Sequence, residues 1–551
     1  MTSLPVTFLA QVAVPTIEWS SIAPELPPTA AALVLLLVAI SRPRPQVVAL
    51  PIAAVAVAAG VLMHGAGHTL PAVVTGLLGL SLPVLVARFP GRPSLVQAWG
   101  AGLSLVAALV LTGWQYATHL TVVPGQDLIA VHDAMAGSVA SDGIALFTRL
   151  TVYLVALLVV PLGYGYLTDR RINRAEVESL ILLAAVGMAA LGTANDLITA
   201  FIALEVLSLA LYVLAGLARR DRRSQEASLK YFVLGAISSA ILLYGMALVY
   251  VATGTVQLSS IGATIGLVTT PPVVAGLGLA LVTVGVAFKA ALAPFHLWVA
   301  DVYQGAPTSI TAFMAAATKA AAFALALRLY LVAFPSLAGI WVPVLAVLAA
   351  VTMLYGAYLA LVQHDVKRML AYSSVTHAGY AAIGLVAHSD LGLSATLWYV
   401  LTYAVGTVGA FGCVIAVERR RQGEVTLLDL RGLGRSAPAL AGMLGLCLLS
   451  LAGIPATAGF VGKLVVFRAG VDAGLTWLVV VGVVSSAVAA YFYLRIAATM
   501  FLEEPDTNRG LPVVTTGLSA AVAVSAALVL YLGVQPQALL EVARSAAVLV
   551  R

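Results

Sequence analysis

The sequence has few charged residues and few cysteines for its length. Of 551 residues, 9% are charged and 61% are apolar, whereas a soluble globular domain has roughly 25% charged and 45–50% apolar residues. A soluble fold is excluded, because one water-facing core cannot hide so much apolar surface. The two cysteines, Cys413 and Cys447, lie far apart and form no CxxC pair. The chain therefore lacks the ligands for a disulfide framework, a structural zinc site or an iron–sulfur cluster, and we expect no metal or cofactor site in it.

The positive charge of the chain does not indicate a nucleic-acid partner. The formal net charge is +6, but the bases stand in short clusters between apolar runs, with no basic domain behind them. The sequence also lacks a Walker A lysine, an HExxH motif and a GxSxG motif. The longest polar connections, 116–141 and 418–437, are too short for a catalytic domain. We therefore expect the chain to work inside the membrane.

Apolar windows of about 20 residues, each long enough to cross a bilayer as a helix, recur along the whole chain. We predict an all-α polytopic membrane protein with about 16 transmembrane helices. The predicted spans are 23–40, 45–63, 69–87, 95–115, 142–166, 177–195, 197–218, 228–252, 272–296, 305–333, 338–362, 369–387, 391–417, 438–470, 474–500 and 512–533. The windows 45–63 and 69–87 are rich in Gly, Ala and Val, so a single re-entrant hairpin is an alternative for this pair.

Basic residues alternate between successive connections. All but one of the alternate connections are basic and together hold 19 of the 29 basic residues, and the intervening connections contain no Lys or Arg. The positive-inside rule places the basic set in the cytoplasm and both termini outside. The connection 297–304 should then be cytoplasmic, although its only charged residue is Asp301. The first twenty residues have no basic n-region or A-x-A site, so we expect a lead-in on the outer surface and no signal peptide.

Lysine is rare and is found mostly inside the apolar spans. There are five lysines against 24 arginines; Lys289, Lys319 and Lys463 lie deep in spans, Lys230 lies just inside one, and Lys367 belongs to a basic connection. A charge at the centre of a span costs at least about 2.5–3.5 kcal/mol. Burial can make a lysine lose its proton near neutral pH, whereas a guanidinium effectively never does. The deep lysines are therefore candidates for proton exchange.

Glu205 is the acidic residue that we place near the middle of a span. It lies about 8 residues into its helix, which is roughly 12 Å deep. A carboxylate there would be protonated unless a lysine lies nearby. The alternative is a structural Glu–Lys pair that joins two helices. For Lys230 an ordinary surface pair with Glu226, four residues earlier, is an equal alternative to a functional role.

Two prolines interrupt spans close to these lysines. Pro294 follows Lys289 by five residues, and Pro455 precedes Lys463 by eight. A proline frees backbone carbonyls, which at membrane depth is tolerated only where protein or water satisfies them. Broken helices beside ionisable groups in both halves of a chain are typical of transporters with an internal repeat, although a packing kink is the alternative.

Two histidines near these spans are further candidates for proton relay near neutral pH. His296 follows the first break, and His377 lies in the middle of the span 369–387. The alternative for each histidine is a plain hydrogen bond to a backbone carbonyl.

Four segments carry a resemblance to a known family. They are EASLKYFVLGAISSAILLYGMALVYVATG (226–254), FKAALAPFHLWVADVYQGAPTSITAFMAAATKAAAF (288–323), HDVKRMLAYSSVTHAGY (364–380) and LSLAGIPATAGFVGKL (449–464). The sequence resembles the subunit N family of the proton-pumping NADH:quinone oxidoreductases (respiratory complex I), one of three antiporter-like subunit families. The resemblance covers roughly residues 142–535. The DVYQGAP segment is typical of subunit N and not of its sisters, and the lysine at position 463 separates it from the sister that has a glutamate there.

The resemblance implies a core of fourteen helices, with N-terminal helices in 1–141, a third core helix and loop at 142–176, and a C-terminal helix and tail at 501–551. The segment 41–94 departs from the family pattern: we expect it to add a hairpin of about two helices near the N-terminus, and its role is open. It also implies two inverted five-helix repeats, at 177–333 and 338–500, each with a broken helix.

The resemblance also assigns roles to the buried groups. Glu205 and Lys289 would form a charge pair, Lys319 the central relay and Lys463 the terminal group. Lys230 would be an auxiliary lysine near the pair, and His296 would lie along the polar axis.

The implied function is proton translocation in the bacterial inner (plasma) membrane. The implied partners are the sister antiporter-like subunits and small helical subunits of the membrane arm, and FMN, iron–sulfur clusters and quinone would belong to other subunits or their interfaces. Two alternatives stay open: a subunit of a multisubunit cation/proton antiporter, and a structural spacer of the arm that does not pump.

Overall fold

A computed structural model of the chain describes residues 19–40, 69–88, 92–119, 132–135, 137–172, 176–267, 273–421, 423–505 and 511–546. The predicted span 45–63 lies outside these residues, so the possible hairpin at 41–94 is described only in part. Its second half, helix α3, is one continuous helix over Thr69–Arg88.

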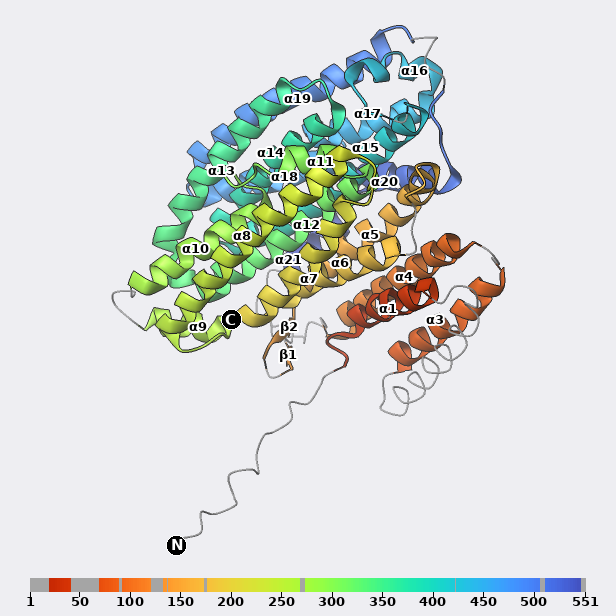
Figure 1. Cartoon of the computed structure of the whole chain (residues 1–551). Helices are drawn as coiled ribbons and strands as arrows, with labels where there is room; N and C mark the ends of the chain where they lie inside the picture. The colour runs from red at the N-terminus through yellow and green to blue at the C-terminus, as the bar shows by residue number, and fades with distance from the viewer. Residues whose placement is uncertain are drawn as a thin grey trace.

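The described residues form one elongated bundle of helices that run side by side (Figure 1). Twelve of the described helices are long and apolar enough to cross a membrane. The expectation of a helical membrane protein is therefore confirmed, and the number of sixteen spans stays a prediction. The helices of 15 residues or more, which include these twelve, are α1 (Leu26–Ile40), α3, α4 (Pro93–His119), α5 (Gly143–Asp169), α6 (Glu176–Thr193), α7 (Leu197–Ala215), α8 (Arg222–Thr253), α10 (Val273–Ala290), α12 (Thr308–Arg328), α13 (Ala338–Leu361), α14 (Val366–Val386), α15 (Asp390–Arg421), α17 (Pro438–Ala452), α18 (Ala458–Asp472), α19 (Thr476–Leu502) and α20 (Thr516–Val534).

Several short elements in the connections were not predicted. They are the antiparallel hairpin of β1 (His132–Ala134) and β2 (Val139–Ser141), and the helices α9 (Leu258–Gly266), α11 (Val299–Gly305), α16 (Leu433–Ser436) and α21 (Gln537–Ser545). The hairpin departs from the purely α-helical expectation. It lies at the same end of the bundle as α9, and α16 lies at the opposite end (Figure 1).

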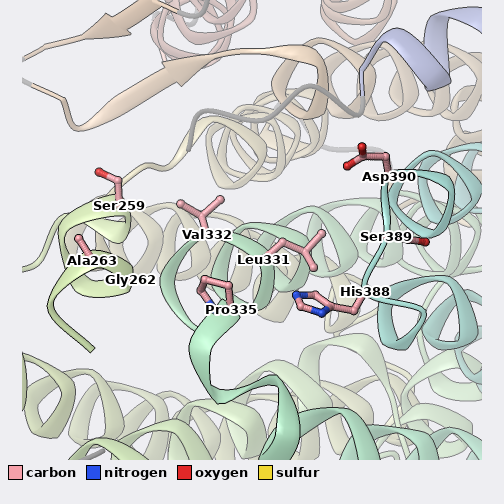
Figure 2. A pocket seen from close by; sticks show the side chains of 9 residues that line it. All are labelled: Ser259, Gly262, Ala263, Leu331, Val332, Pro335, His388, Ser389 and Asp390. Atoms are coloured by element: carbon pink, nitrogen blue, oxygen red, sulfur yellow. The ribbon is translucent and has the colours of Figure 1, made fainter. Parts of the chain in front are cut away.

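Contacts between connections agree with the predicted alternation of sides. Single β-bridges join Val139 to Ala194 and Asp196 to Gln257, all at the end predicted to face outward. A cavity of about 450 Å³ at that end is lined by the connections around 259–263, 331–335 and 388–390 (Figure 2). The tail reaches the same end, where a Cβ on Gly143 would lie 2.1 Å from the Cα of Ala546. Which membrane face this end occupies stays a prediction.

The connection predicted at 297–304 is mostly helical, so its bounds are wrong, whereas the membrane side on which it lies stays a prediction. Most of these residues belong to α11, which continues the span interrupted after Ala290, and only residues 306–307 separate α11 from α12. The polar residues around Asp301 made the second half of a broken helix read as a loop.

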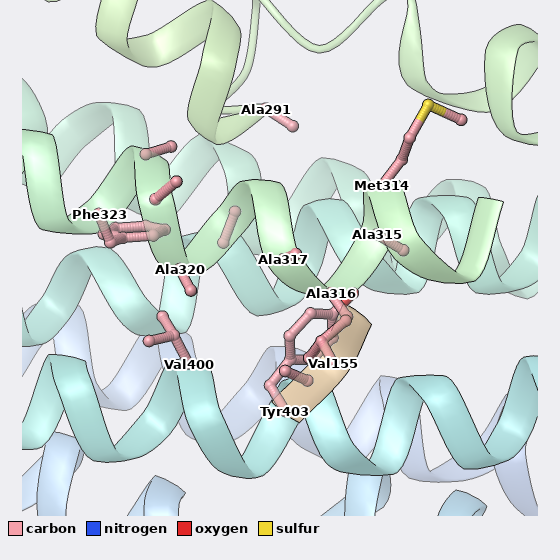
Figure 3. Packing of buried hydrophobic residues seen from close by; sticks show 14 of the residues in the cluster. Val155, Ala291, Met314, Ala315, Ala316, Ala317, Ala320, Phe323, Val400 and Tyr403 are labelled. Atoms are coloured by element: carbon pink, nitrogen blue, oxygen red, sulfur yellow. The ribbon is translucent and has the colours of Figure 1, made fainter. Parts of the chain in front are cut away.

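Helix α12 is the centre of the bundle. All of its residues are buried, and it packs against α5, α10, α14 and α15. The small side chains of its alanine run let neighbouring backbones approach closely. In Figure 3, Val400 and Tyr403 of α15 and Val155 of α5 lie against this helix. Lys319 is therefore surrounded by protein and not by lipid.

Two arginines outside the basic connections lie fully buried in ion pairs. Arg328 donates two hydrogen bonds to Asp142, at 2.6 and 3.0 Å, and Arg149 pairs with Glu25 at 2.6 Å. A buried guanidinium is tolerated when a carboxylate pairs with it in good geometry. These arginines tie α5 to α12 and to the N-terminal segment.

Candidate functional site

The first broken helix places Lys289 at the end of a half-helix. Helix α10 ends at Ala290, and α11 begins at Val299 after an irregular segment that contains Pro294. The freed backbone groups find partners in protein: the Ala293 amide donates to Thr352 Oγ1 at 2.8 Å, and the Phe288 carbonyl accepts from Trp298 Nε1 at 3.2 Å. The predicted break is therefore present and is satisfied as membrane depth requires.

Lys289 is buried between α7, α8 and α10. Its ammonium group donates to Ser208 Oγ at 2.7 Å and lies 5.6 Å from the centre of the Tyr231 ring. Both contacts stabilise a cation, the first by a hydrogen bond and the second by cation–π attraction. The side chain that the sequence identified thus has specific partners in the core.

Glu205 lies one helical turn before Ser208 on α7, and one of its oxygens accepts a hydrogen bond from Ser239 Oγ at 2.6 Å. These two described residues, Glu205 and Lys289, form no direct ion pair. A cavity of about 10 Å³, lined by both Ser239 and Lys289, lies between α7, α8 and α10. That volume is about the least that holds one water molecule. The expected charge pair is therefore not a direct contact: each group has its own serine partner, and the two groups interact electrostatically.

Lys319 lies near the middle of α12, eleven residues from its start. It is 2% exposed, and its amine makes no hydrogen bond or ion pair with any residue of the described ranges. An ammonium group without partners is costly in a protein interior. Lys319 is therefore held in place by its helix and not by polar contacts.

His377 connects the regions of Lys319 and Lys463. Its two ring nitrogens contact Tyr399 Oη at 2.6 Å and Tyr493 Oη at 3.1 Å. The charges of both lysines act on the ring electrostatically. The alternative of a plain hydrogen bond from His377 to a backbone carbonyl is not what the structure contains.

Lys463 contacts the second broken helix at its interruption. Helix α17 ends at Ala452 and α18 begins at Ala458. The amine donates to the carbonyls of Leu451 and Ala452, at 3.1 and 2.8 Å, and to Ser486 Oγ at 2.8 Å. These carbonyls form the negative end of the α17 dipole, which favours a cation. The half-helix thus provides the site for Lys463.

His296 lies in the irregular segment between α10 and α11. It is buried, its ring meets the edge of Tyr355 at 5.1 Å, and its Nδ1 has no hydrogen-bond partner among the described residues. An unpaired buried nitrogen is uncommon in native proteins and is normally satisfied by an ordered water. The position is compatible with a group on a polar path.

Lys230 belongs to a partly exposed charge cluster. Its amine pairs with Glu226 at 2.6 Å and with Asp301 at 2.7 Å, and Asp301 also pairs with Arg368 at 2.8 Å. Partial burial of Asp301 opposes ionisation, but hydrogen bonds from Lys230 and Arg368 hold the pKa of Asp301 below its ordinary value. Ser239, which donates to Glu205, lies nine residues further along α8, so Lys230 is about 13 Å from it along the helix axis. Lys230 thus makes the surface pair with Glu226 that the alternative described, and it also pairs with Asp301.

Sequence reasoning missed a second buried charge cluster. Glu418, the last acidic residue of α15, is 4% exposed and accepts hydrogen bonds from Tyr166 Oη at 3.0 Å and from Arg170 at 2.8 Å. Lys367, which we assigned to a basic connection, is buried in the first turn of α14, and its amine donates to the Ala306 carbonyl at 2.8 Å. Both residues border arginine-rich connections, so no local signal separates them from charges that face water.

Comparisons with known proteins agree with this architecture. The family model described as NADH:quinone oxidoreductase/Mrp antiporter, TM, matches residues 194–489. A protein named NADH-quinone oxidoreductase subunit N from Rhodococcus opacus is 49% identical over 70% of this chain and 73% of its own length. Another of that name, from Trichlorobacter lovleyi, is 39% identical over 87% of this chain and 96% of its own length. The chain belongs to the NADH-quinone oxidoreductase subunit N family.

One solved structure supports the family assignment, and a second has a similar fold. A chain of respiratory complex I from Thermus thermophilus, solved with bound aureothin, is 35% identical with a TM-score of 0.67, over 85% of this chain and 98% of that chain. A chain of the Mrp complex from Dietzia sp. is similar in fold, with a TM-score of 0.71 at 24% identity, over 91% of this chain and 97% of that chain. The family model spans all seven predicted site residues, from Glu205 to Lys463.

Proposed function

We propose that the chain carries protons across the membrane as the subunit N of a bacterial NADH-quinone oxidoreductase. The observation that carries the proposal is the series Lys289, Lys319, His377 and Lys463, which occupies the protein interior between two interrupted helices. Each of these groups can bind and release a proton. Redox chemistry elsewhere in the complex supplies the energy; this chain contributes no electron transfer.

Unpaired hydroxyl groups support a hydrated path along this series. Tyr303, Ser374, Tyr403 and Thr407 each have a buried side-chain oxygen without a hydrogen-bond partner among the described residues. The Tyr403 ring lies 4.8 Å from that of His377. Buried polar groups are normally paired, with ordered water where protein does not serve. We therefore infer that water molecules connect the lysines around His377.

Electrostatic coupling between neighbouring sites is large enough to drive transport. Two unit charges about 7 Å apart at an effective dielectric of about 20 interact by roughly 2 kcal/mol. Moving one charge against 100 mV requires about 2.3 kcal/mol. Protonation of Lys289 would strengthen its attraction to Glu205, and loss of that proton would weaken it; either change would alter the proton affinity of Lys319, and then of Lys463.

The two breaks have corresponding roles in the proposed architecture. A lysine belongs to the last turn of α10, and another lysine binds the carbonyl end of α17. This correspondence supports two inverted five-helix repeats, at 177–333 and 338–500, within a fourteen-helix core. The additional N-terminal segment 41–94 keeps no assigned role.

The remaining parts of the machinery belong to partners. We propose that sister antiporter-like subunits and small helical subunits flank the chain, and that FMN, iron–sulfur clusters and quinone reside in other subunits or at their interfaces. We further propose that the assembly lies in the bacterial inner membrane, with both termini of this chain outside.

The test is Lys289→Met in the whole complex, compared with Lys289→Arg. Assembly and NADH oxidation by an artificial acceptor are measured first, and NADH-driven proton uptake by inside-out vesicles second. We expect both variants to assemble and to lose most proton uptake, because methionine binds no proton and arginine does not release one. Arg468→Gln, at an exposed residue, is the control.

The outcomes separate the alternatives. An assembled Lys289→Met complex with unchanged protons per NADH would support a spacer that does not pump. Sodium-dependent transport by the isolated membrane arm would support a cation/proton antiporter.

A further inference from the structure

A polar cavity opens at the end of the bundle that the positive-inside rule assigns to the cytoplasm. Its volume is about 240 Å³, and five connections contribute to its lining. The innermost charged side chains are Arg170, Asp365, Lys367 and Glu418, and Asp221, Arg223 and Glu424 stand with them in the lining. Acids and bases are nearly balanced, so the cavity is not built to hold a multiply charged anion.

Glu418 is the most buried carboxylate of this cavity. Its oxygens accept hydrogen bonds from Tyr166 of α5, from Arg170 directly after α5 and from Thr308 of α12. Thr308 is the first residue of α12, the helix that carries Lys319. The positive end of the α12 dipole therefore faces this carboxylate. Glu418 thus connects the cavity to the central helix.

Asp365 and Lys367 complete the inner wall. One oxygen of Asp365 caps α14 by accepting from the Arg368 amide at 2.7 Å, and the other is buried without a hydrogen-bond partner among the described residues. Burial raises the pKa of Asp365 above its ordinary value. Lys367 interacts electrostatically with both Asp365 and Glu418. The wall therefore has a buried carboxylate oxygen without a hydrogen-bond partner among the described residues, and several titratable groups. A site that exchanges protons with water needs such groups.

Hydroxyl groups continue inward from this wall. Lys367 and Ser374 lie on one face of α14, seven residues apart, which is about 10 Å. The unpaired oxygens of Ser374, Tyr303 and Tyr403 come from α14, α11 and α15. Three helices thus provide polar groups between the cavity and the level of His377.

We infer that this cavity is the site at which protons from the aqueous phase enter the chain, with Glu418 as the carboxylate that receives them. The inference rests on the proposed function, which it extends by naming the side and residue of uptake. A buffer acid in the cavity transfers one proton to Glu418, and its conjugate base returns to the bulk. Glu418 then releases that proton along the hydroxyl path to the Lys319 amine.

The first test compares Glu418→Gln, Glu418→Asp and Lys289→Met in the intact complex. Proton uptake by inside-out vesicles is followed from about pH 6 to about pH 9, which is the working range of the assay reagents. We expect Glu418→Gln to lose most uptake, with the loss growing as the pH rises, because a receiving carboxylate matters most when protons are scarce. Glu418→Asp restores uptake because it keeps the carboxylate. The control is Glu503→Gln, an exposed carboxylate that pairs with Arg431 at the same end.

The outcomes keep the two proposals apart. Normal uptake in Glu418→Gln, or a loss that does not depend on pH and that aspartate does not restore, overturns the uptake site; if Lys289→Met is still defective, the proposed function stands. Normal uptake in both Glu418→Gln and Lys289→Met overturns both proposals.

A second test needs no change to a charged residue. Ala218 lines the cavity, and both native cysteines are buried. We expect Ala218→Cys to react with a membrane-impermeant maleimide in inside-out vesicles only, and the attached group to block uptake. Reaction from the opposite side, or full uptake after complete labelling, would contradict the assignment.

Discussion

The serine hydroxyls that contact Glu205 and Lys289 lead to a quantitative prediction for Ser208→Ala. The change removes the 2.7 Å hydrogen bond from the lysine amine, together with the hydrogen bond that the Ser208 hydroxyl donates to the Leu204 carbonyl of its own helix. A hydrogen bond to a charged group contributes about 1.5–3 kcal/mol, and about 1.4 kcal/mol corresponds to a factor of ten in an equilibrium constant. We expect the protonated form of Lys289 to become roughly ten- to a hundredfold less populated relative to the neutral form.

The assay is NADH-driven proton uptake by the assembled complex, measured for Ser208→Ala, Ser239→Ala and the double variant. Ser239 donates to Glu205 at 2.6 Å. If both hydroxyls serve one coupled pair, their effects are not additive. The double variant then loses less proton uptake than the two single variants together, when each loss is expressed as a free energy. Ser525→Ala, in α20, is a matched buried control, because its hydroxyl donates to the Ala521 carbonyl of its own helix. Strictly additive losses of proton uptake, or no loss for either serine variant, would refute the coupling between Glu205 and Lys289.

Three further predictions concern contacts outside this pair. Asp142→Asn leaves Arg328 as an unpaired buried cation and should destabilise the subunit by about 3–5 kcal/mol, whereas replacing both residues by apolar ones should cost much less; thermal unfolding of the purified complex measures both. Asp301→Asn should lower thermal stability above about pH 4, and the difference from the native complex should vanish on acidification, because a lowered pKa stabilises the fold only while the carboxylate is ionised. Tyr493→Phe removes a partner of His377 and should slow proton uptake without impairing assembly, which native electrophoresis checks; unchanged uptake would contradict the role of His377.

The deep ionisable residues could be predicted from the sequence because their signal is local. Glu205, Lys319 and Lys463 stand in apolar runs where a charge is costly, and this needs no knowledge of the fold. Proline gave an equally local signal for both interruptions, at Pro294 and Pro455. These features survive in any packing of the helices.

The partners of these residues could not be predicted. Residues such as Ser208, Ser239 and Tyr399 do not stand out in the hydropathy of their spans. Only tertiary packing brings their hydroxyl groups to an ionisable side chain. Glu418 precedes three arginines, so its position reads as a connection that faces water. Lys367 was misassigned for the same reason.

The most direct measurement of the central claim is the number of protons translocated per NADH by a complex with Lys319→Met. Lys319 makes no hydrogen bond or ion pair with the described residues, and methionine has a similar length and no charge. The substitution therefore removes the ability to bind a proton without breaking a polar contact. If buried amines pass protons along the chain, the complex assembles with normal or higher stability and translocates fewer protons per NADH. An assembled variant that keeps the native ratio would contradict the account.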